Sequence, residues 1–202
     1  MFILLNLIKR LIDKNMIRTI KYFKNNRTLY FAIGVTLAFF LYITFILSHV
    51  SSCFALDVGI NSLGLSFYYT KDMVQNFFEV RTQEQLLCYS QFLQIWDAIF
   101  AVVYTLMYIS WIRYFFKNKP LFLIIPIFCM IADWAENYVE LLMLETYLNL
   151  SPISEILVSL GSGINSLKWA LSILTYLIIL IGIMITLKIF LTNLIFRKKT
   201  PQ

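Results

Sequence analysis

Three carboxyl side chains and one amide recur at helical spacing within a single apolar stretch of the chain. Asp133, Glu136, Asn137 and Glu140 share one sector of about 100° when the stretch is wound as a helix. An acid at the centre of a membrane-spanning helix costs about 3 kcal/mol of insertion free energy, so this face must turn towards polar partners or water. Adjacent carboxyls with separated pKa values can act as acid and base, relay protons or bind a cation.

Other apolar stretches bring polar side chains to a similar depth. Asp97 and Tyr104 lie in the preceding stretch, Lys168 begins the last one and His49 ends the first. The candidate catalytic residues are Asp97, Asp133 and Glu136, and the candidate ligand-binding residues are Asn137, Glu140, Lys168, Tyr104, Trp134 and His49. Each has a structural alternative: an ion pair between Glu140 and Lys168, interhelical hydrogen bonds from Asp97 and Asp133, and an interfacial position for Trp134 or His49.

The acids outnumber the basic groups expected near them, which are Lys168, His49 and Arg81. Such an excess cannot stay ionised at low dielectric, so some carboxyls must be protonated, hydrated or bound to a cation. One His excludes a three-His zinc site, and an oxygen-rich site favours Mg, Mn or Ca over Zn. The sequence assigns no metal and no cofactor. Pro126 lies on the same face and is expected to bend the helix before the acids.

The composition defines the class of protein that must position these residues. The 202 residues are 60% hydrophobic and 14% charged, with a mean hydropathy of +0.76. A soluble domain needs about a quarter of its residues charged. A soluble globule, a disordered chain and a fibrous repeat are therefore excluded. The sequence predicts an all-α integral membrane four-helix bundle, with spans at 28–49, 86–112, 120–147 and 167–191.

The basic residues predict how the bundle is oriented. Fourteen of the 17 Lys and Arg residues precede the first span, follow the second or end the chain, leaving Lys71, Arg81 and Lys168 for the other side. This bias predicts a bacterial inner-membrane protein with both termini in the cytoplasm. Residues 1–27 form a basic amphipathic segment on the cytoplasmic leaflet, or a frayed extension before Met16, and residues 192–202 form a basic tail. The charge is not arranged as a nucleic-acid-binding face, so no nucleic acid is expected.

An extended outer segment, residues 50–85, joins the first two spans and is too apolar to be a free loop. We expect it to pack over the mouth of the bundle as a lid. Thr70 precedes a short amphipathic pattern, and Thr82 with Gln85 forms a capping-box pair. Cys53 and Cys88 fall at the outer ends of adjacent spans, where they either form a disulfide or stay free.

Several of these residues carry a resemblance. The chain resembles a family of uncharacterised four-helix bacterial inner-membrane proteins in Ser62-Leu-Gly-Leu-Ser-Phe67, Phe77-Phe78, Arg81, Glu84-Gln85-Leu86, Trp96-Asp97, Asp133-x-x-Glu136-Asn137 and Lys168-Trp169. That family implies the fold but no activity. In the order of its acids, the chain is also similar to the emopamil-binding and sigma-2 receptor group, whose members bind or isomerise sterols. It lacks the second-span His of the isomerases, so no catalytic residue carries over.

These observations lead to three hypotheses of function. The first is an outward-facing acidic pocket that binds a membrane lipid or isoprenoid, with acid–base chemistry by Asp97, Asp133 and Glu136. The second is a proton- or cation-linked transport or accessory subunit, with a polar path continuing through Tyr104 and Tyr108. The third is a structural subunit whose acids hold a partner membrane subunit. A closed apolar cavity beside the acids would favour the first hypothesis. Whether the protein is an enzyme stays open.

Overall fold

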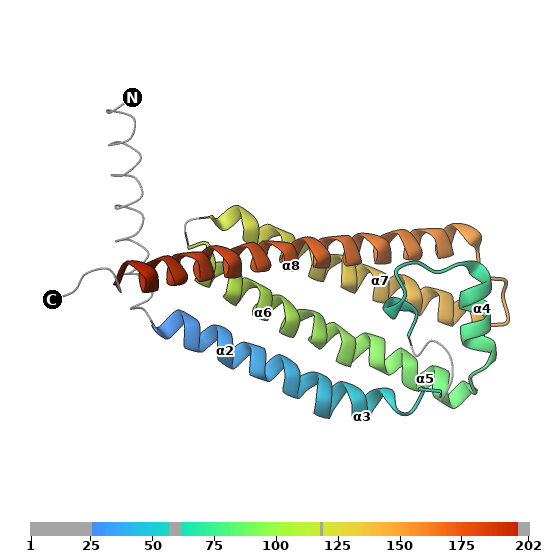
Figure 1. The fold of residues 1–202 in the computed structure, drawn as a ribbon. Coiled ribbons are helices and arrows are strands. Elements are labelled where there is room, and N and C mark those ends of the chain that lie inside the picture. The colour runs from blue at the N-terminus through green and yellow to red at the C-terminus, as the bar shows by residue number, and fades with distance from the viewer. Residues whose placement is uncertain (1–25, 57–61, 118, 198–202) are drawn as a thin grey trace.

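The computed structural model describes residues 26–56, 62–117 and 119–197, and these residues form helices connected by short irregular segments, with no strand among them. Four helical stretches are long and apolar enough to cross a membrane: Arg27–Ser51, Gln83–Phe115, Pro120–Leu148 and Glu155–Thr192. The all-helical class and the four apolar helices predicted from the sequence are confirmed (Figure 1). Most of the predicted amphipathic segment 1–27 and the end of the tail lie outside the described residues.

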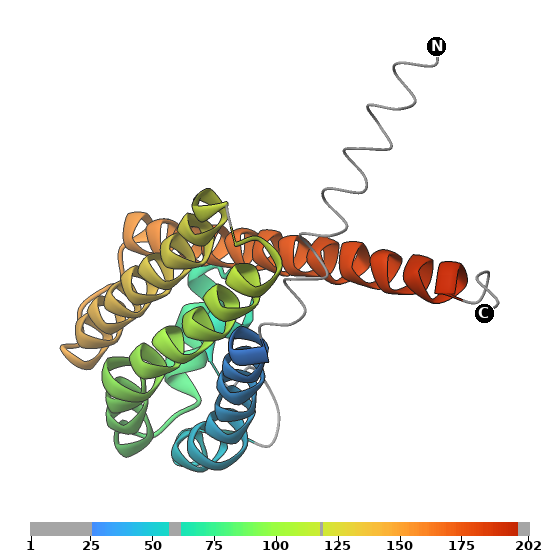
Figure 2. The same cartoon turned by 90° about the vertical axis from the view of Figure 1, so that its left-hand side faces the viewer.

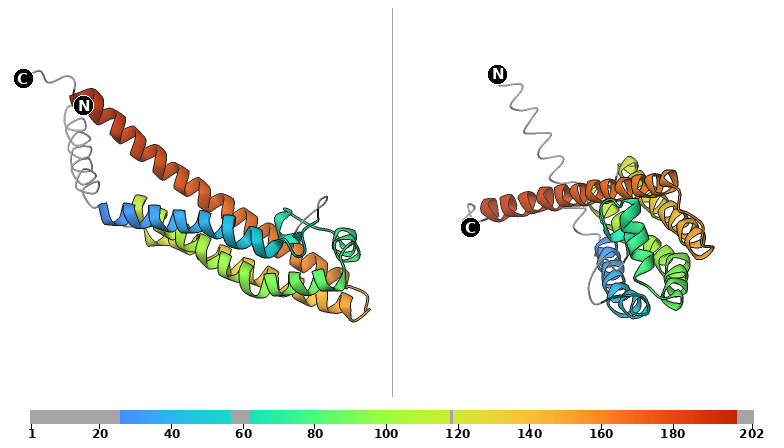
Figure 3. Two further views of the ribbon diagram at one scale, coloured as in Figure 1. Left: turned by 90° about the horizontal axis from the view of Figure 1, so that it is seen from below. Right: turned by 90° about the vertical axis from the view of Figure 1, so that its right-hand side faces the viewer.

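The four long helices pack unequally. α7 (Ile124–Leu148) and α8 (Glu155–Arg197) form the largest contact, and α6 (Ala98–Phe115) touches α2, α7 and α8. α2 (Asn26–Leu41) packs mainly on α6. α8 crosses the bundle obliquely and diverges from α2, as Figures 2 and 3 show. The bundle is therefore closed between α7 and α8 and looser between α2 and α8.

The two ends of the bundle differ in charge. α2 begins, α6 ends, α7 begins and α8 ends at one end, which we call the basic end (Figure 1). Arg27, Arg113, Lys117, Lys119 and Lys188 lie in the parts of these helices and connections nearest that end. The opposite end carries the segment between the first two long helices, which we call the cap (residues 53–56 and 62–82).

Local sequence signals position the cap. α4 (Lys71–Glu79) starts where the Thr70 hydroxyl accepts a hydrogen bond from the backbone N–H of Met73. α5 (Gln83–Gln91) starts with the predicted capping box, in which Thr82 and Gln85 bond each other's backbone. A disulfide joins Cys53 to Cys88, with their Cα atoms 6.4 Å apart. The cap buries its own apolar cluster against the helix ends, including Phe54, Leu63, Val74, Phe77 and Phe78.

Two π-helical turns face each other just below the cap. η1 (Tyr42–Leu47) interrupts the first long helix before α3 (Ser48–Ser51), and η3 (Phe92–Asp97) joins α5 to α6. The Tyr42 hydroxyl donates a hydrogen bond of 2.8 Å to the Trp96 carbonyl, linking the two turns. A π-turn displaces the side chains that follow it and is often found at functional sites. Here the second one ends at Asp97.

Two expectations about the helices change. α8 begins at Glu155 rather than near Leu167, although Gly161 and Gly163 lower the helix propensity of this part. It forms because Gly161 lets α8 approach the cap: a Cβ there would overlap the Tyr69 hydroxyl and lie 2.9 Å from Val139. Pro126 does not need to bend a helix. It is third in α7, after the short η4 (Pro120–Leu123), and the first-turn N–H groups have no partner within the helix.

Candidate functional site

A cavity of about 500 Å³ lies under the cap, between the four long helices. All four helices and the cap contribute to its lining. Its apolar and aromatic wall includes Phe39, Ile43, Phe92, Phe100 and Trp169. Its polar side chains are Asp97, Asp133, Asn137, Glu140, Lys168, Tyr104 and Tyr108, with Ser48, Ser51, Ser62 and Ser172.

Lys168 organises the polar cluster. Its Nζ lies 3.2 Å from Asp133 Oδ1 and forms a second ion pair with Glu136, and it donates to the Gly64 carbonyl at 3.3 Å. The predicted pair between Glu140 and Lys168 is replaced by these two, because Lys168 lies beside Glu136, one helical turn before Glu140. The Lys168 charge is thus matched by two carboxylates, and Gly64 of the cap is held to them.

Asp133 and Asp97 are the two acids nearest the apolar part of the cavity. Asp133 Oδ2 accepts a hydrogen bond of 2.9 Å from the Tyr104 hydroxyl. Asp97 Oδ2 accepts one of 2.9 Å from Asn137 Nδ2. These contacts join the second long helix to α7, so the predicted interhelical hydrogen bonds of both acids are present. Both carboxyls also line the cavity, which leaves them within reach of a ligand.

Glu140 takes a different partner from the one expected. The fully buried Tyr89 hydroxyl donates to Glu140 Oε2, and it also lies 3.3 Å from the Ser62 hydroxyl of the cap. The Tyr89 ring packs edge-on against Phe54 and against Phe77. Glu140 is thereby tied to the core of the cap. Nothing in the spacing of the sequence identified Tyr89, because it lies at the polar start of its span.

Side chains of α8 hold the cap segment 62–69 in place. Ser162 Oγ accepts from the Tyr69 N–H at 3.0 Å, Asn165 donates to the Ser66 carbonyl at 2.6 Å, and Ser166 donates to the Phe67 carbonyl at 3.0 Å. These bonds give an irregular segment the backbone partners it lacks internally. The polar residues near the start of α8 therefore hold the backbone of the cap in place by hydrogen bonds.

Glycine at position 64 is required by this close approach. A Cβ on Gly64 would lie 3.0 Å from Glu136 Oε1 and 3.2 Å from Lys168 Nζ. Trp169 Nε1 donates to the Gly64 carbonyl at 3.1 Å, beside the bond from Lys168. The backbone of the cap thus sits directly on the ion pair.

Three predicted site residues do not line the cavity. Trp134 is 42% exposed and donates from Nε1 to the Ala98 carbonyl, because it is rotated about 100° from Asp133. His49 is exposed at the end of the first long helix. Glu136 is fully buried behind Lys168. Trp134 and His49 therefore lie outside the cavity lining, and Glu136 is ion-paired with Lys168.

Arg81 also lies away from the acids. It donates to the carbonyls of Phe54 and Phe77 at 3.0 and 2.7 Å, and its guanidinium stacks 3.6 Å from the Phe77 ring centroid. Burial lowers the pKa of the guanidinium from its ordinary value. Arg81 thus stabilises the cap, and Lys168 is the cation of the acidic cluster described above.

Cys129 lines the cavity and is the only free cysteine, because Cys53 and Cys88 are bonded to each other. Its Sγ lies 3.8 Å from the Tyr104 hydroxyl and donates to the Lys168 carbonyl at 3.5 Å. Its side chain is almost fully buried, so it belongs to the packed wall of the cavity.

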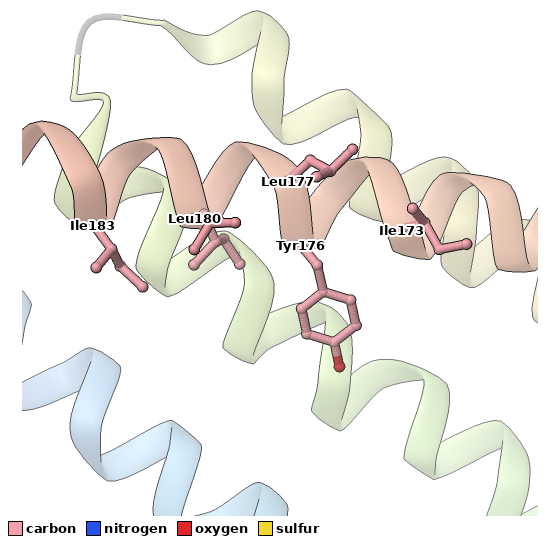
Figure 4. Close-up of a pocket in the computed structure, with 6 residues that line it drawn as sticks. Ile173, Tyr176, Leu177, Leu180 and Ile183 are labelled. Carbon is pink, nitrogen blue, oxygen red and sulfur yellow. The ribbon is translucent and has the colours of Figure 1, made fainter.

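A second hollow adjoins the cavity on the α8 side. It measures about 370 Å³ and is lined by α8 residues only: Ile173, Tyr176, Leu177, Ile179, Leu180 and Ile183. Figure 4 shows Tyr176 projecting from α8 towards α6, with the aliphatic side chains along the same helix. Tyr176 also lines the main cavity. The acidic cluster is therefore continuous with an apolar surface on the open side between α8 and α2.

In the part of the chain that the structure describes, no group of three His, Cys, Asp or Glu side chains is placed to hold a metal ion. The chain matches no family model, no curated protein and no solved structure. Function is therefore inferred from the cavity and its side chains, and the family resemblance stays a prediction.

Proposed function

We propose that this chain is a multi-pass membrane protein that binds a lipid or isoprenoid, with the head of the ligand at the acidic cluster and its apolar part between α2 and α8. The observation that carries the proposal is the cavity of about 500 Å³, which joins aromatic and aliphatic walls to a small set of convergent polar groups. This combination is typical of small-molecule sites. The loose contact between α2 and α8 supports entry from the side.

The charges of the cavity favour one kind of head group. Lys168 is already matched by Asp133 and Glu136, while Asp97 and Glu140 also face the cavity and are held by neutral partners. A phosphate group would meet these carboxyls without a free cation to balance it. A hydroxyl or amine head is therefore favoured over a phosphorylated one.

The dimensions of the helices support the predicted membrane orientation. Lys168 and Lys188 are separated along α8 by about 30 Å at 1.5 Å per residue, about the thickness of a hydrocarbon core. The basic end would then lie at the cytoplasmic surface of a bacterial inner membrane, with the acidic cluster near the outer boundary. A lipid head group at that depth would lie near the membrane surface, so its polar atoms would not have to be buried in the hydrocarbon core.

Within this site, we extend the proposal to proton transfer by Asp97 and Asp133, since both carboxyls line the cavity. Glu136, the third predicted catalytic residue, is left out because it lies behind Lys168. Incubating the wild type and Asp97→Asn with the ligand they retain, followed by mass analysis of that ligand, tests this extension. A product formed by the wild type and not by the variant is expected.

The binding proposal is tested by native mass spectrometry of the chain released gently from its membrane. The wild type is expected to carry a lipid or isoprenoid mass, and Asp133→Asn is expected to lose most of it. Glu145→Gln, on the exposed face of the same helix, is the matched control and should retain the ligand.

Labelling of Cys129 gives a second readout of the same site. Cys129 is buried, so a small thiol reagent reaches it only when the cavity opens. Bound ligand should slow that reaction further, and the slowing should vanish in Asp133→Asn. Bare protein in both samples, with equal labelling of Cys129, would contradict the proposal.

The hydrogen bonds between the cavity and the basic end give less support to a proton or cation relay. From Asp133 the hydrogen bonds continue to Tyr104, and the Tyr108 hydroxyl lies 3.1 Å from Ser172. Towards the basic end, the buried hydroxyls of Thr105, Ser110 and Thr175 donate to backbone carbonyls instead.

A partner subunit that is present in the wild type and lost from Asp133→Asn in the mass-spectrometry experiment would favour the structural-subunit alternative.

A further inference from the structure

Behind the ion pair of Lys168, a second group of polar atoms lies between the cap, α7 and α8. Among the residues that the structure describes, five buried oxygen atoms there have no hydrogen-bond partner. Glu136 Oε2 is ion-paired with Lys168, which leaves four: Tyr69 Oη, Glu136 Oε1, Glu140 Oε1 and Asn165 Oδ1. Leaving a buried polar atom unpaired costs about 1–3 kcal/mol. Four such atoms in one place call for an occupant.

The register of α7 on α8 brings these four atoms together. Lys168 pairs with Glu136, while Gly161 packs on Val139 with only 2.9 Å between its virtual Cβ and Val139 Cγ1. The part of α8 between these two contacts, which includes Asn165, therefore lies opposite Glu140. The Glu136 and Glu140 carboxyls are within hydrogen-bonding reach of each other, yet neither offers a donor when ionised.

Tyr69 closes this chamber from the cap. Its side chain is 3% exposed, and its hydroxyl fills the space beside Gly161. Burial raises the pKa of Tyr69 well above its ordinary value, and the nearby carboxyls of Glu140 and Glu136 raise it further. The hydroxyl thus lies near the two acids. Tyr69, Glu136 and Asn165 do not line the main cavity, whereas Glu140 does, so this chamber adjoins the proposed ligand site and shares only Glu140 with it.

We propose that this chamber binds one sodium ion, coordinated by the orphan oxygens of Glu136, Glu140, Asn165 and Tyr69. Two carboxylates with two neutral oxygens form a hard donor set for a singly charged ion, whereas a divalent metal would need more acidic ligands. The charge balance agrees. Asp133 and Glu136 already exceed the charge of Lys168, and Glu140 adds another carboxylate, which accepts a hydrogen bond from the neutral Tyr89.

The ion would link three elements that otherwise meet only through side chains. α7 supplies both carboxylates, α8 supplies the amide and the cap supplies the phenol. Sodium should therefore stabilise the closed cap over the cavity, in addition to any effect of the lipid. Sodium binding does not require a lipid in the main cavity, so a failure of this inference and a failure of the proposed function can be told apart.

The test is thermal unfolding of the purified full-length chain in detergent, followed by tryptophan fluorescence. Sodium chloride is titrated against choline chloride at constant ionic strength and pH. The wild type should show a saturable rise in Tm with sodium. Equilibrium dialysis with radioactive sodium should give one ion per chain. Tyr69→Phe, which keeps the ring and its packing, should weaken sodium binding several-fold. Glu140→Gln should weaken it by about tenfold or more.

Glu145→Gln is the matched control, since this carboxyl is exposed on the same helix, and its sodium response should equal that of the wild type. Equal Tm values in sodium and choline would overturn the proposal. So would an unchanged sodium response in Tyr69→Phe, or a Tm that depends on pH but not on sodium, which would assign the chamber to protons. Lipid retention measured on the same samples reports the proposed function independently.

Discussion

The cap end and the basic end of this bundle are stabilised in different ways. At the cap end, large side chains such as Phe54, Phe78 and Tyr89 are almost fully buried, and a disulfide, ion pairs and side-chain bonds to the backbone add to their packing. Towards the basic end, the buried cluster is smaller: Ala101, Tyr104, Met107, Tyr108 and Cys129.

The difference indicates which part of the molecule needs its surroundings to cover apolar side chains. In the most apolar part of Arg27–Ser51 only 11% is buried within the protein, and in that of Glu155–Thr192 17%, against 39% for each of the two middle stretches. The exposed apolar side chains of α2 and α8 need lipid or a partner to cover them. The cap end resembles the core of a soluble domain, and four substitutions test that contrast.

The largest effect is expected from Lys168→Met. It leaves the buried carboxyls of Asp133 and Glu136 without their cation and removes a donor to the Gly64 carbonyl. Breaking a buried ion pair costs about 3–5 kcal/mol, and denaturant unfolding in detergent measures the loss. Lys188→Met, at the exposed basic end of the same helix, should change stability by less than about 0.5 kcal/mol. Equal losses would remove the contrast between the two ends.

Phe78→Ala should follow, with a loss of about 3–4 kcal/mol. Phe78 has no exposed surface, so its removal leaves a cavity in the core of the cap. Phe45 is 68% exposed on the first long helix, and Phe45→Ala is the control. It should cost well under 1 kcal/mol in the same unfolding assay, because detergent replaces the lost contacts. A large loss for Phe45→Ala would place a protein interface on that face.

Replacing both Cys53 and Cys88 by Ser should cost about 2–4 kcal/mol, because the bond closes a loop with a sequence separation of 35. We expect faster amide hydrogen exchange in the cap and unchanged exchange in α6. Cys129→Ser controls for the loss of a thiol and should leave the cap protected. Equal acceleration in α6 would mean that the two ends unfold as one unit.

The smallest effect is expected from Tyr69→Phe at alkaline pH. The raised pKa of Tyr69 in the folded chain means that its stabilising contribution is complete below about pH 10, where an unfolded tyrosine begins to ionise, and is lost as the pH rises further. Stability between about pH 10 and 11 should therefore fall less steeply in Tyr69→Phe, by about 1 kcal/mol. Tyr68→Phe, exposed next to it, should follow the wild type.

Much of this arrangement could be predicted because it depends on local signals. Run length located the apolar helices, Thr82 and Gln85 fixed the start of α5, and the shared sector of Asp133, Glu136 and Asn137 anticipated their burial. The proximity of Cys53 and Cys88 also followed from the ends of adjacent spans. These features need only the geometry of one helix or one connection.

What could not be predicted depends on how one helix is placed against another. The partner of Lys168 is set by the axial offset of α8 on α7, which Gly161 and Val139 determine across the interface. Spacing within the sequence carries no information on that offset, so Glu140 was assigned to Lys168 in place of Asp133 and Glu136. Trp134 lies outside the cavity lining for a simpler reason, since its neighbour Asp133 already occupies the buried direction.

The two π-turns also have a consequence for insertions and deletions in the coding sequence. A π-turn holds one residue more than the α-helical turn it replaces, so it corresponds to a single-codon insertion in an otherwise regular helix. Deleting one residue from Phe92–Asp97 would turn the π-turn into an α-helical turn, so the flanking parts of the helix would keep nearly the same orientation while the side chains inside the turn changed direction. The change would be confined to the part of the cavity wall around Asp97, and the cap would keep its own core. Insertions and deletions here would alter the cavity in a step that no substitution can reproduce.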